Sequence, residues 1–299
     1  MRQVFTDSEQ QAEFEREGFV VVRLLSADDA AAFLGPLARV RANSAGAASC
    51  TMDLEQSFCT TDAEYRHRMD ALCSALIGEA LLSLLVDYRL SGCGVMVKRA
   101  KAGAMALHRD RTIMADPTIP VISAWCPLVD IDDSRGNLML LPGSHRLPNV
   151  ETAGVERFYA GYETELKRMC VSRPLKAGEA ILFDNRLLHW SLPNLSEQER
   201  PVVRGTAVAE EQRLVFYRLD KSSGGKGFEI LDAEIDGPVA HSPDDVADGT
   251  ITPPTIGYVE NRNRPVSLRE CRAILGGALP RPATRSAAIM NRVRAALRA

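Results

Sequence analysis

The N-terminal part of the chain, residues 1–88, has the apolar spacing of helices. Apolar residues recur there every three or four positions, which would bury one face of each helix. Thr6 and Glu9 have the spacing of a capping box, and Gly18 suits a helix end because glycine readily adopts the left-handed conformation. The pattern predicts helices at residues 6–18, 26–41 and 62–86, a β-branched strand at residues 19–25 and a loop at residues 43–60.

From residue 89 the pattern changes to short apolar stretches separated by Gly, Pro, Asn and Asp. Many short strands with frequent turns favour a β-sandwich or a barrel. Helices followed by strands indicate an α+β fold with a mainly β core and helices packed outside it. The predicted strands cover residues 93–98, 121–129, 137–141, 180–184, 187–190, 202–209 and 213–219, and residues 155–169 are either a helix or a covering loop.

The remainder of the chain, residues 221–299, differs in composition from the part before it. It is rich in Gly, Pro and Asp up to about residue 265, which predicts loop, and apolar residues at four-residue spacing predict a helix at residues 285–298. We therefore expect one domain at residues 1–220 and a C-terminal extension at residues 221–299. The extension would pack on the core as a lid or as a subunit contact, and the second case implies a homodimer.

Composition narrows the class of protein. The chain has 299 residues, of which 45% are hydrophobic and 25% charged, with a net charge of −3. These values are typical of a soluble globular protein and argue against a nucleic-acid or membrane partner. The seven cysteines include no Cys-x-x-Cys pair, so a disulfide framework or a zinc site is not expected. The first residues, Met-Arg-Gln-Val-Phe-Thr-Asp, do not have the apolar pattern of a signal segment, so we expect a cytoplasmic protein.

Three of the five histidines lie in the β-rich part, and two of them suggest a metal site. His108 and Asp110 are two residues apart, so on an extended strand their side chains point to the same face. His189, after the predicted strand 180–184, is the best candidate for a third ligand. Two imidazoles and one carboxylate match the facial triad of iron(II) oxygenases. In that triad the three protein ligands occupy one face of the iron and leave the coordination positions of the opposite face open.

The His-x-Asp pair alone is a weak signal, but the segment around His189 makes it specific. This segment resembles the distal motif of the phytanoyl-CoA dioxygenase family of 2-oxoglutarate-dependent oxygenases, with a serine, an asparagine and an arginine at Ser191, Asn194 and Arg200. Three further segments resemble the family in the same order along the chain: Gly-Phe-Val-Val at residues 18–21, His-x-Asp at residues 108–110 and Pro-Gly-Ser-His at residues 142–145. The resemblance covers roughly residues 10–220.

The resemblance implies a double-stranded β-helix, or jelly roll, with iron(II) at one open end. It also implies that Arg200 binds the distal carboxylate of 2-oxoglutarate through parallel donors, with Arg204 as the alternative. Ser191 would add a hydroxyl donor, and Lys98 is a further candidate. The implied reaction consumes dioxygen and hydroxylates, or otherwise oxidises, an unactivated C–H bond. The carboxylate of Asp110 argues against halogenation, because related halogenases have a small residue there.

The resemblance defines the substrate and the residues that bind it less well. A secondary metabolite, an amino-acid derivative or an acyl thioester would fit the resemblance. Arg109, Arg111 or Arg135 could meet an anionic group of the substrate, although ordinary surface arginines are an equal interpretation. His145 is expected to line the pocket, and Trp125 belongs either to the core or to the pocket wall. Two other classes stay open: a cupin-like metal enzyme that does not use 2-oxoglutarate, and a non-catalytic β-barrel binding protein.

Overall fold

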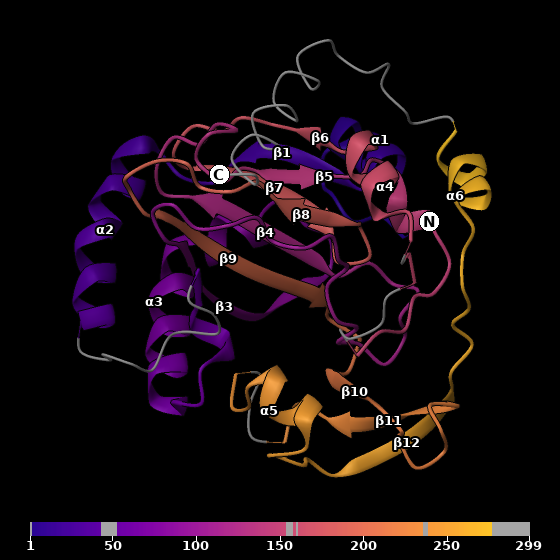
Figure 1. The fold of residues 1–299 in the computed structure, drawn as a ribbon. Coiled ribbons are helices and arrows are strands. Elements are labelled where there is room, and N and C mark those ends of the chain that lie inside the picture. The colour runs from indigo at the N-terminus through magenta and orange to yellow at the C-terminus, as the bar shows by residue number, and fades with distance from the viewer. Residues whose placement is uncertain (1, 43–52, 154–157, 160, 236–238, 277–299) are drawn as a thin grey trace.

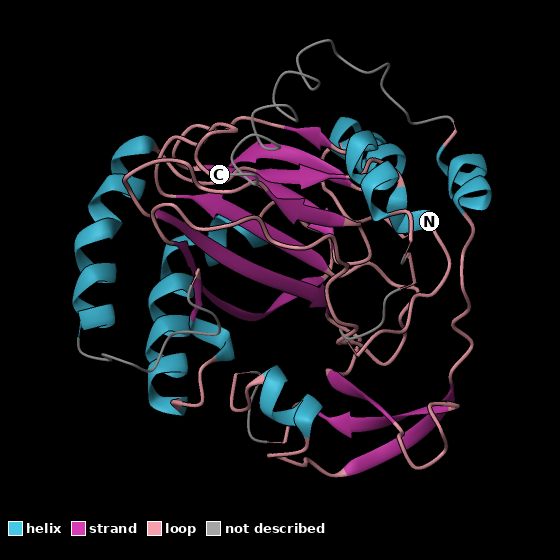
Figure 2. Cartoon of the chain, in the orientation of Figure 1, coloured by secondary structure: helices cyan, strands magenta, loops and turns pink. Residues whose placement is uncertain are grey.

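The computed structural model describes residues 2–42, 53–153, 158, 159, 161–235 and 239–276, and within them it shows a mixed fold of helices and antiparallel sheets (Figures 1 and 2). The largest sheet has six strands in the order β1-β7-β4-β9-β3-β2. Its strands are β1 (Phe19–Arg23), β2 (Leu54–Gln56), β3 (Tyr88–Lys98), β4 (Ile122–Pro127), β7 (Glu179–Asp184) and β9 (Arg200–Ala209).

Two smaller sheets accompany the large one. The first has the order β6-β5-β8 and consists of β5 (Leu138–Leu140), β6 (Val171–Ser172) and β8 (His189–Ser191). The second has the order β10-β11-β12 and consists of β10 (Val215–Leu219), β11 (Gly227–Asp232) and β12 (Thr255–Glu260). Every strand pair in these described sheets is antiparallel, as expected for a chain with short turns between its strands.

The helices begin and end at capping residues that the sequence supplies. The N-cap of α1 (Ser8–Glu17) is Asp7, whose carboxylate accepts from the amides of Glu9 and Gln10, so the predicted capping role of Thr6 is wrong. Gly18 ends the helix at φ 84°, as predicted. The other helices are α2 (Ala27–Ala42), α3 (Ala63–Leu82), α4 (Glu163–Met169), α5 (Pro243–Asp248) and α6 (Leu268–Leu275), and the 3-10 turns are η1 (Ser57–Cys59) and η2 (Ser144–Arg146).

Alternating residues of the large sheet separate two layers of core. Ala124 and Cys126 of β4 belong to the cluster that contains the inward residues of α3, whereas Trp125 between them belongs to the cluster shared with β5. Figure 1 shows the same order, with α2 and α3 on one side of the large sheet and β5, β6 and β8 on the other. This period of two fixes which side chains enter the space between the sheets, where the site lies.

The C-terminal part corrects the prediction of loop over residues 221–265. Strands β11 and β12 and helix α5 occupy much of this range, and they form a layer of their own beside the core with β10 (Figure 1). The cause of the error is that glycines and acidic residues flank strands of only six residues. Strand β2 likewise lies in a segment predicted as loop. The helix predicted at residues 285–298 lies outside the described residues. Within the described part, no helix is long and apolar enough to span a membrane.

Candidate metal centre and adjoining cavity

Three predicted ligands converge at one point. His108 and His189 form an isolated antiparallel bridge in which each amide donates to the other's carbonyl over 2.9 Å. Asp110 follows two residues later, and its amide is anchored on the carbonyl of Asn185. One ligand atom from each side chain lies within 4.8 Å of the other two. Asp110 Oδ1 is 4.0 Å from His108 Nε2 and 3.8 Å from His189 Nε2.

Backbone carbonyls fix the orientation of both imidazoles. His108 Nδ1 lies 2.9 Å from the carbonyl of Ala106, and His189 Nδ1 lies 2.9 Å from the carbonyl of Leu187. A carbonyl only accepts, so each Nδ1 carries a proton, and in the neutral ring Nε2 is the nitrogen that can bind a metal. Burial, with a further contribution from the His108 ring, lowers the pKa of His189 to about 4. His189 is therefore a neutral ligand at neutral pH.

One oxygen of the Asp110 carboxylate is held by hydrogen bonds from two side chains of the core. Its Oδ2 accepts from Arg204 Nη2 at 2.8 Å and from the Ser123 hydroxyl at 3.1 Å, which leaves Oδ1 directed to the imidazoles. Burial by itself would raise the pKa of Asp110, but the guanidinium of Arg204 and the two imidazoles outweigh it and lower the pKa below its ordinary value. Asp110 is thus an ionised ligand, and Arg204 has a task other than the carboxylate-binding role considered for it.

Two buried cations lie together on neighbouring strands beside this centre. Lys98 of β3 and Arg200 of β9 are paired residues in the antiparallel ladder. Lys98 Nζ donates to Ser191 Oγ at 2.8 Å and to the carbonyl of Leu192 at 2.6 Å. Burial and the charge of Arg200 lower the pKa of Lys98 to about 7, and Asp53 opposes this to a smaller extent.

Arg200 is 1% exposed, and not all of its guanidinium donors have a hydrogen-bond partner. One nitrogen, Nη1, donates to the carbonyl of Gly136 at 2.6 Å, while Nε has no partner. Its guanidinium carbon is 5.0 Å from the centre of the Trp125 ring, so Trp125 is a wall beneath the cation. Burial lowers the pKa of Arg200 to about 9. Two cations without an acidic partner at hydrogen-bond distance, in the described part of the chain, are costly unless an anion joins them.

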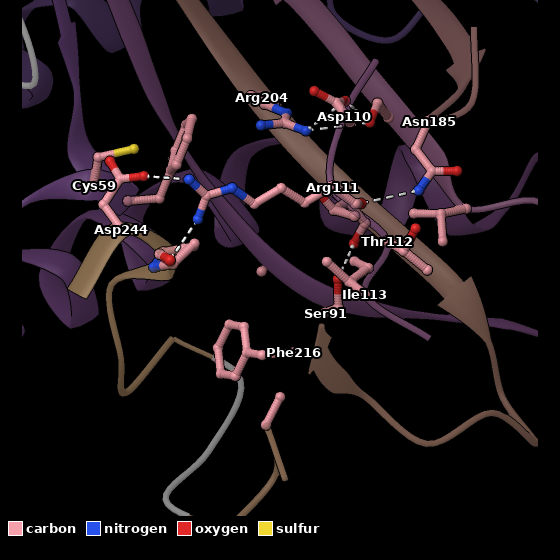
Figure 3. A pocket seen from close by; sticks show the side chains of 18 of the residues that line it. Cys59, Ser91, Asp110, Arg111, Thr112, Ile113, Asn185, Arg204, Phe216 and Asp244 are labelled. Carbon is pink, nitrogen blue, oxygen red and sulfur yellow. Dashed lines mark hydrogen bonds and ion pairs between the residues drawn. The ribbon is translucent and has the colours of Figure 1, made fainter. Parts of the chain in front are cut away.

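A cavity of about 460 Å³ opens on the other side of His108 and Asp110. It lies between the core strands and the layer formed by β10 and α5. Figure 3 shows Asp110 and Arg204 on one side, Arg111 crossing the middle, and the Phe216 ring projecting from β10 toward them. His189, Ser191, Lys98 and Arg200 do not line this cavity. The cation pair therefore lies outside the cavity that His108 and Asp110 line.

The predicted substrate residues lie elsewhere or are already engaged. His145 does not line the cavity; it is buried in η2 against Phe14 and Gly18 at the end of α1, so the prediction that it lines the pocket is wrong. Arg109 lines the cavity but donates to four backbone carbonyls, and Arg111 pairs with Asp244. Arg135 bonds to Gln198 and to the carbonyl of Glu199.

Several cavity residues gave no signal of their role in the sequence. Ser123 lies on a strand whose local pattern marks it only as a polar position, and Arg204 was considered only for the carboxylate of 2-oxoglutarate. The contacts of both with Asp110 depend on the pairing of β4 with β9. The sequence pattern predicted Phe216 as an ordinary strand residue, and it placed Asp244 in a loop rich in Pro and Asp. No local pattern could have placed these two opposite the His-x-Asp pair.

Comparisons with known proteins agree with this site. The family model described as phytanoyl-CoA dioxygenase (PhyH) matches residues 14–202. A curated protein of Dictyostelium discoideum, phytanoyl-CoA dioxygenase domain-containing protein 1 homolog, is 25% identical over 169 residues, which are 53% of this chain and 60% of that protein. The aligned part is thus less than two thirds of the relative.

Solved structures share the fold. The non-heme alpha ketoglutarate dependent epimerase SnoN from nogalamycin biosynthesis has a TM-score of 0.52 and 22% identity, over 70% of this chain and 84% of its own. HygX from Streptomyces hygroscopicus, with nickel and 2-oxoglutarate bound, has a TM-score of 0.50 and 17% identity, over 68% of this chain and 87% of its own. Because the family model spans more than half of its residues, the chain belongs to the phytanoyl-CoA dioxygenase (PhyH) family.

Proposed function

We propose that the protein is an iron(II)- and 2-oxoglutarate-dependent dioxygenase that hydroxylates, or otherwise oxidises, an unactivated C–H bond of a small molecule. One observation carries the proposal: two imidazoles and one ionised carboxylate converge next to a pair of buried cations that lack an anion. The first group suits a divalent iron, and the second suits a dicarboxylate co-substrate.

The ligand set fits the metal. His108 and His189 direct Nε2 lone pairs, and Asp110 directs Oδ1, toward the same point. Ligand atoms about 2.1 Å from one ion and at right angles are about 3 Å apart, so small side-chain rotations would close the present separations. Three donors at right angles would occupy one face of the ion and would leave the opposite face for exchangeable ligands.

The cation pair fits 2-oxoglutarate. Arg200 has an unpaired Nε and a buried guanidinium, Lys98 holds the Ser191 hydroxyl beside it, and Trp125 closes the space below. A carboxylate bound there would neutralise both cations and accept the donors that the protein leaves free. SnoN has been solved with Fe3+ and alpha ketoglutarate, and its similarity in fold, at a TM-score of 0.50, supports the same use of this fold.

Bound iron(II) and 2-oxoglutarate would together supply the activation of dioxygen needed to oxidise a C–H bond. The chain's own residues position the metal ligands and shield the centre. Arg204 and Ser123 keep one oxygen of Asp110 directed at the centre. The ring of Phe183 lies 4.9 Å from that of His189 and keeps this side apolar. The carboxylate of Asp110 fills the position that a halide would need, so hydroxylation is favoured over halogenation.

The finer architecture belongs to the same proposal. The six-stranded sheet and the β6-β5-β8 sheet enclose the apolar cluster around Trp125, as the two sheets of a double-stranded β-helix would. Residues 1–220 would be the catalytic domain, and residues 221–299 an extension that covers it.

Anaerobic titration with iron(II) and then 2-oxoglutarate tests the proposal. We expect a weak visible charge-transfer band that is absent from His189→Ala and retained in His67→Ala, whose side chain is exposed on α3. Succinate formation should require both iron and 2-oxoglutarate. Turnover without 2-oxoglutarate would favour a cupin-like enzyme instead, and failure to bind iron would favour a binding protein.

A further inference from the structure

The lining of the cavity beside the metal centre carries more positive than negative charge. In the described part of the chain it includes four arginines and two aspartates: Arg66, Arg109, Arg111, Arg204, Asp110 and Asp244. Arg204 pairs with Asp110 at the metal centre, and Arg111 pairs with Asp244 of α5. With the histidines neutral, Arg66 and Arg109 therefore leave a formal excess of two positive charges. Iron(II) and a doubly ionised 2-oxoglutarate would together add no net charge to this sum.

Backbone carbonyls satisfy donors of Arg66 and Arg109 but do not neutralise their charge. Arg66 donates to three carbonyls, and Arg109 donates to four. Arg109 Nε is buried without a partner, as Arg200 Nε is at the site proposed for 2-oxoglutarate. Asp62 and Asp245 act on Arg66 only from beyond ion-pair distance. Because a carbonyl has no net charge, burial of these cations is costly unless an anion enters the cavity.

Arg111 is the arginine of the lining whose partner can be exchanged for an anion. Figure 3 shows its side chain reaching across the cavity toward Asp244. One terminal nitrogen donates to the Pro243 carbonyl and the other to Asp244 Oδ1. The Asp244 side chain is 51% exposed, so water would solvate the released carboxylate. An exposed ion pair changes an equilibrium constant by only about fivefold or less. Release of Arg66 or Arg109 would instead break three or four bonds to carbonyls.

One wall of the cavity is apolar and lies outside the family match. The match ends at residue 202, and the apolar residues beyond it that line the cavity from β10, α5 and their flanks include Leu214, Phe216, Val246 and Ala247. Figure 3 shows the Phe216 ring projecting toward the side that carries Asp110. Arg111 directly follows this metal ligand in the chain. The cation, the metal centre and the apolar wall therefore border one space.

We propose that the substrate is an organic acid with an apolar body, whose carboxylate replaces that of Asp244 on Arg111 while the body lies against Phe216. A cavity of about 460 Å³ accommodates a drug-sized molecule of this kind. The replaced partner is itself a carboxylate, so the guanidinium already meets the geometry that such a group needs. The inference rests on the proposed function only in assigning the cavity to the substrate.

Binding of matched acids and amides to the full-length, zinc-loaded protein tests this inference. Calorimetry would compare hexanoate, octanoate and hydrocinnamate, each with its primary amide, which has nearly the same shape without the charge. Saturating 2-oxoglutarate is present so that the probes do not bind at Lys98 and Arg200. At least one carboxylate should bind, and about tenfold or more tightly than its amide, because hydrogen bonds between charged groups are stronger than those to a neutral amide.

Substitutions at the two ends of the ion pair should change the affinity in opposite directions. Arg111→Gln removes the cation, so it should weaken carboxylate binding by about tenfold or more and change amide binding much less. Arg111→Lys should restore part of the preference for the carboxylate. Asp244→Asn removes the competing acid, so it should strengthen carboxylate binding by about threefold to fivefold. Asp248→Asn is the matched control, because it makes the same charge change at an exposed position of α5 outside the cavity, where solvent screening should limit the effect to about twofold or less.

Any of three results would overturn the inference: carboxylates that bind the wild type no more tightly than their amides, or not at all; an unchanged carboxylate affinity in Arg111→Gln; or no gain in Asp244→Asn beyond that of Asp248→Asn. A steric explanation does not predict the gain in Asp244→Asn, because asparagine has nearly the shape of aspartate. The readout needs neither iron nor turnover, and the variants locate the probe even if 2-oxoglutarate does not bind. This experiment can therefore fail while the iron and 2-oxoglutarate titration succeeds, and the reverse also holds.

Discussion

Replacing Lys98 by Met should stabilise the protein in the absence of ligands and weaken its response to 2-oxoglutarate. Lys98 is 2% exposed, and its ammonium group faces Ser191 and the buried guanidinium of Arg200 rather than an acid. Methionine has nearly the same length and shape without the charge. The substitution therefore removes an electrostatic cost while keeping most of the packing.

The size of this cost follows from the pKa of Lys98. The pKa falls from 10.5 to about 7 on folding. Because the unfolded chain binds the proton more tightly, folding is opposed by about 5 kcal/mol below pH 7, and this penalty disappears as the pH rises toward 10.5. The bonds to Ser191 Oγ and to the Leu192 carbonyl are lost, which costs about 1 kcal/mol each. The net gain near pH 7 is therefore about 3 kcal/mol.

Urea denaturation of the metal-free protein near pH 7 and near pH 10 measures this gain. Lys98→Met should be more stable than the wild type near pH 7 and lose that advantage near pH 10. With zinc bound, saturating 2-oxoglutarate should stabilise the wild type by about 2–4 kcal/mol and the variant by clearly less. Lys101→Met is the matched control, because Lys101 is exposed and pairs with Glu197 at the surface.

Two results would refute the reasoning. A variant that is less stable than the wild type near pH 7 would mean that the ammonium is stabilised by groups other than those described. An unchanged response to 2-oxoglutarate in Lys98→Met would place the co-substrate away from the cation pair, whatever the stability of the variant.

Three further predictions follow from the same contacts. Arg204→Gln removes the guanidinium that lowers the pKa of Asp110, so metal affinity should fall about 10- to 100-fold and be lost at a higher pH on acidification; an unchanged anaerobic iron titration would contradict this. Burial lowers the pKa of His145 to about 4, so the unfolded chain takes up the proton first as the pH falls from 6.5, and folding loses up to about 3 kcal/mol across that window. His145→Leu should flatten this part of the acid denaturation profile, and equal slopes for the two proteins would rule the explanation out. Gly18→Ala should destabilise by about 2 kcal/mol or more in urea, because φ is 84° and the new Cβ would lie 2.4 Å from His145 Nδ1; a neutral effect would show that this region relaxes.

Local patterns predicted much of the fold. The helices α1, α2 and α3 and the strands β1, β3, β4, β5, β7, β8, β9 and β10 fall within or overlap the predicted segments, because the apolar period of each agrees with its burial in the core. Strands β2, β6, β11 and β12 were missed, since each is short and lies among polar residues or glycines. The capping residue Asp7 was missed for a different reason: Thr6, Asp7 and Ser8 are all good N-caps, and only the start of the helix selects one.

The sequence by itself determined that His108 and Asp110 share a face, because residues two apart on an extended chain must do so. The position of His189 after a predicted core strand made it the best candidate for the third ligand, and the resemblance supported it and added Ser191 and Arg200. The pairing of Arg204 with Asp110, the contact of Lys98 with Ser191 and the wall around Phe216 were decided only by the tertiary structure. Each joins residues about ninety or more positions apart, whose meeting depends on how strands pair and layers stack. The spacing of residues along the chain carries no information about such contacts, and so the lining of the cavity could not be predicted from it.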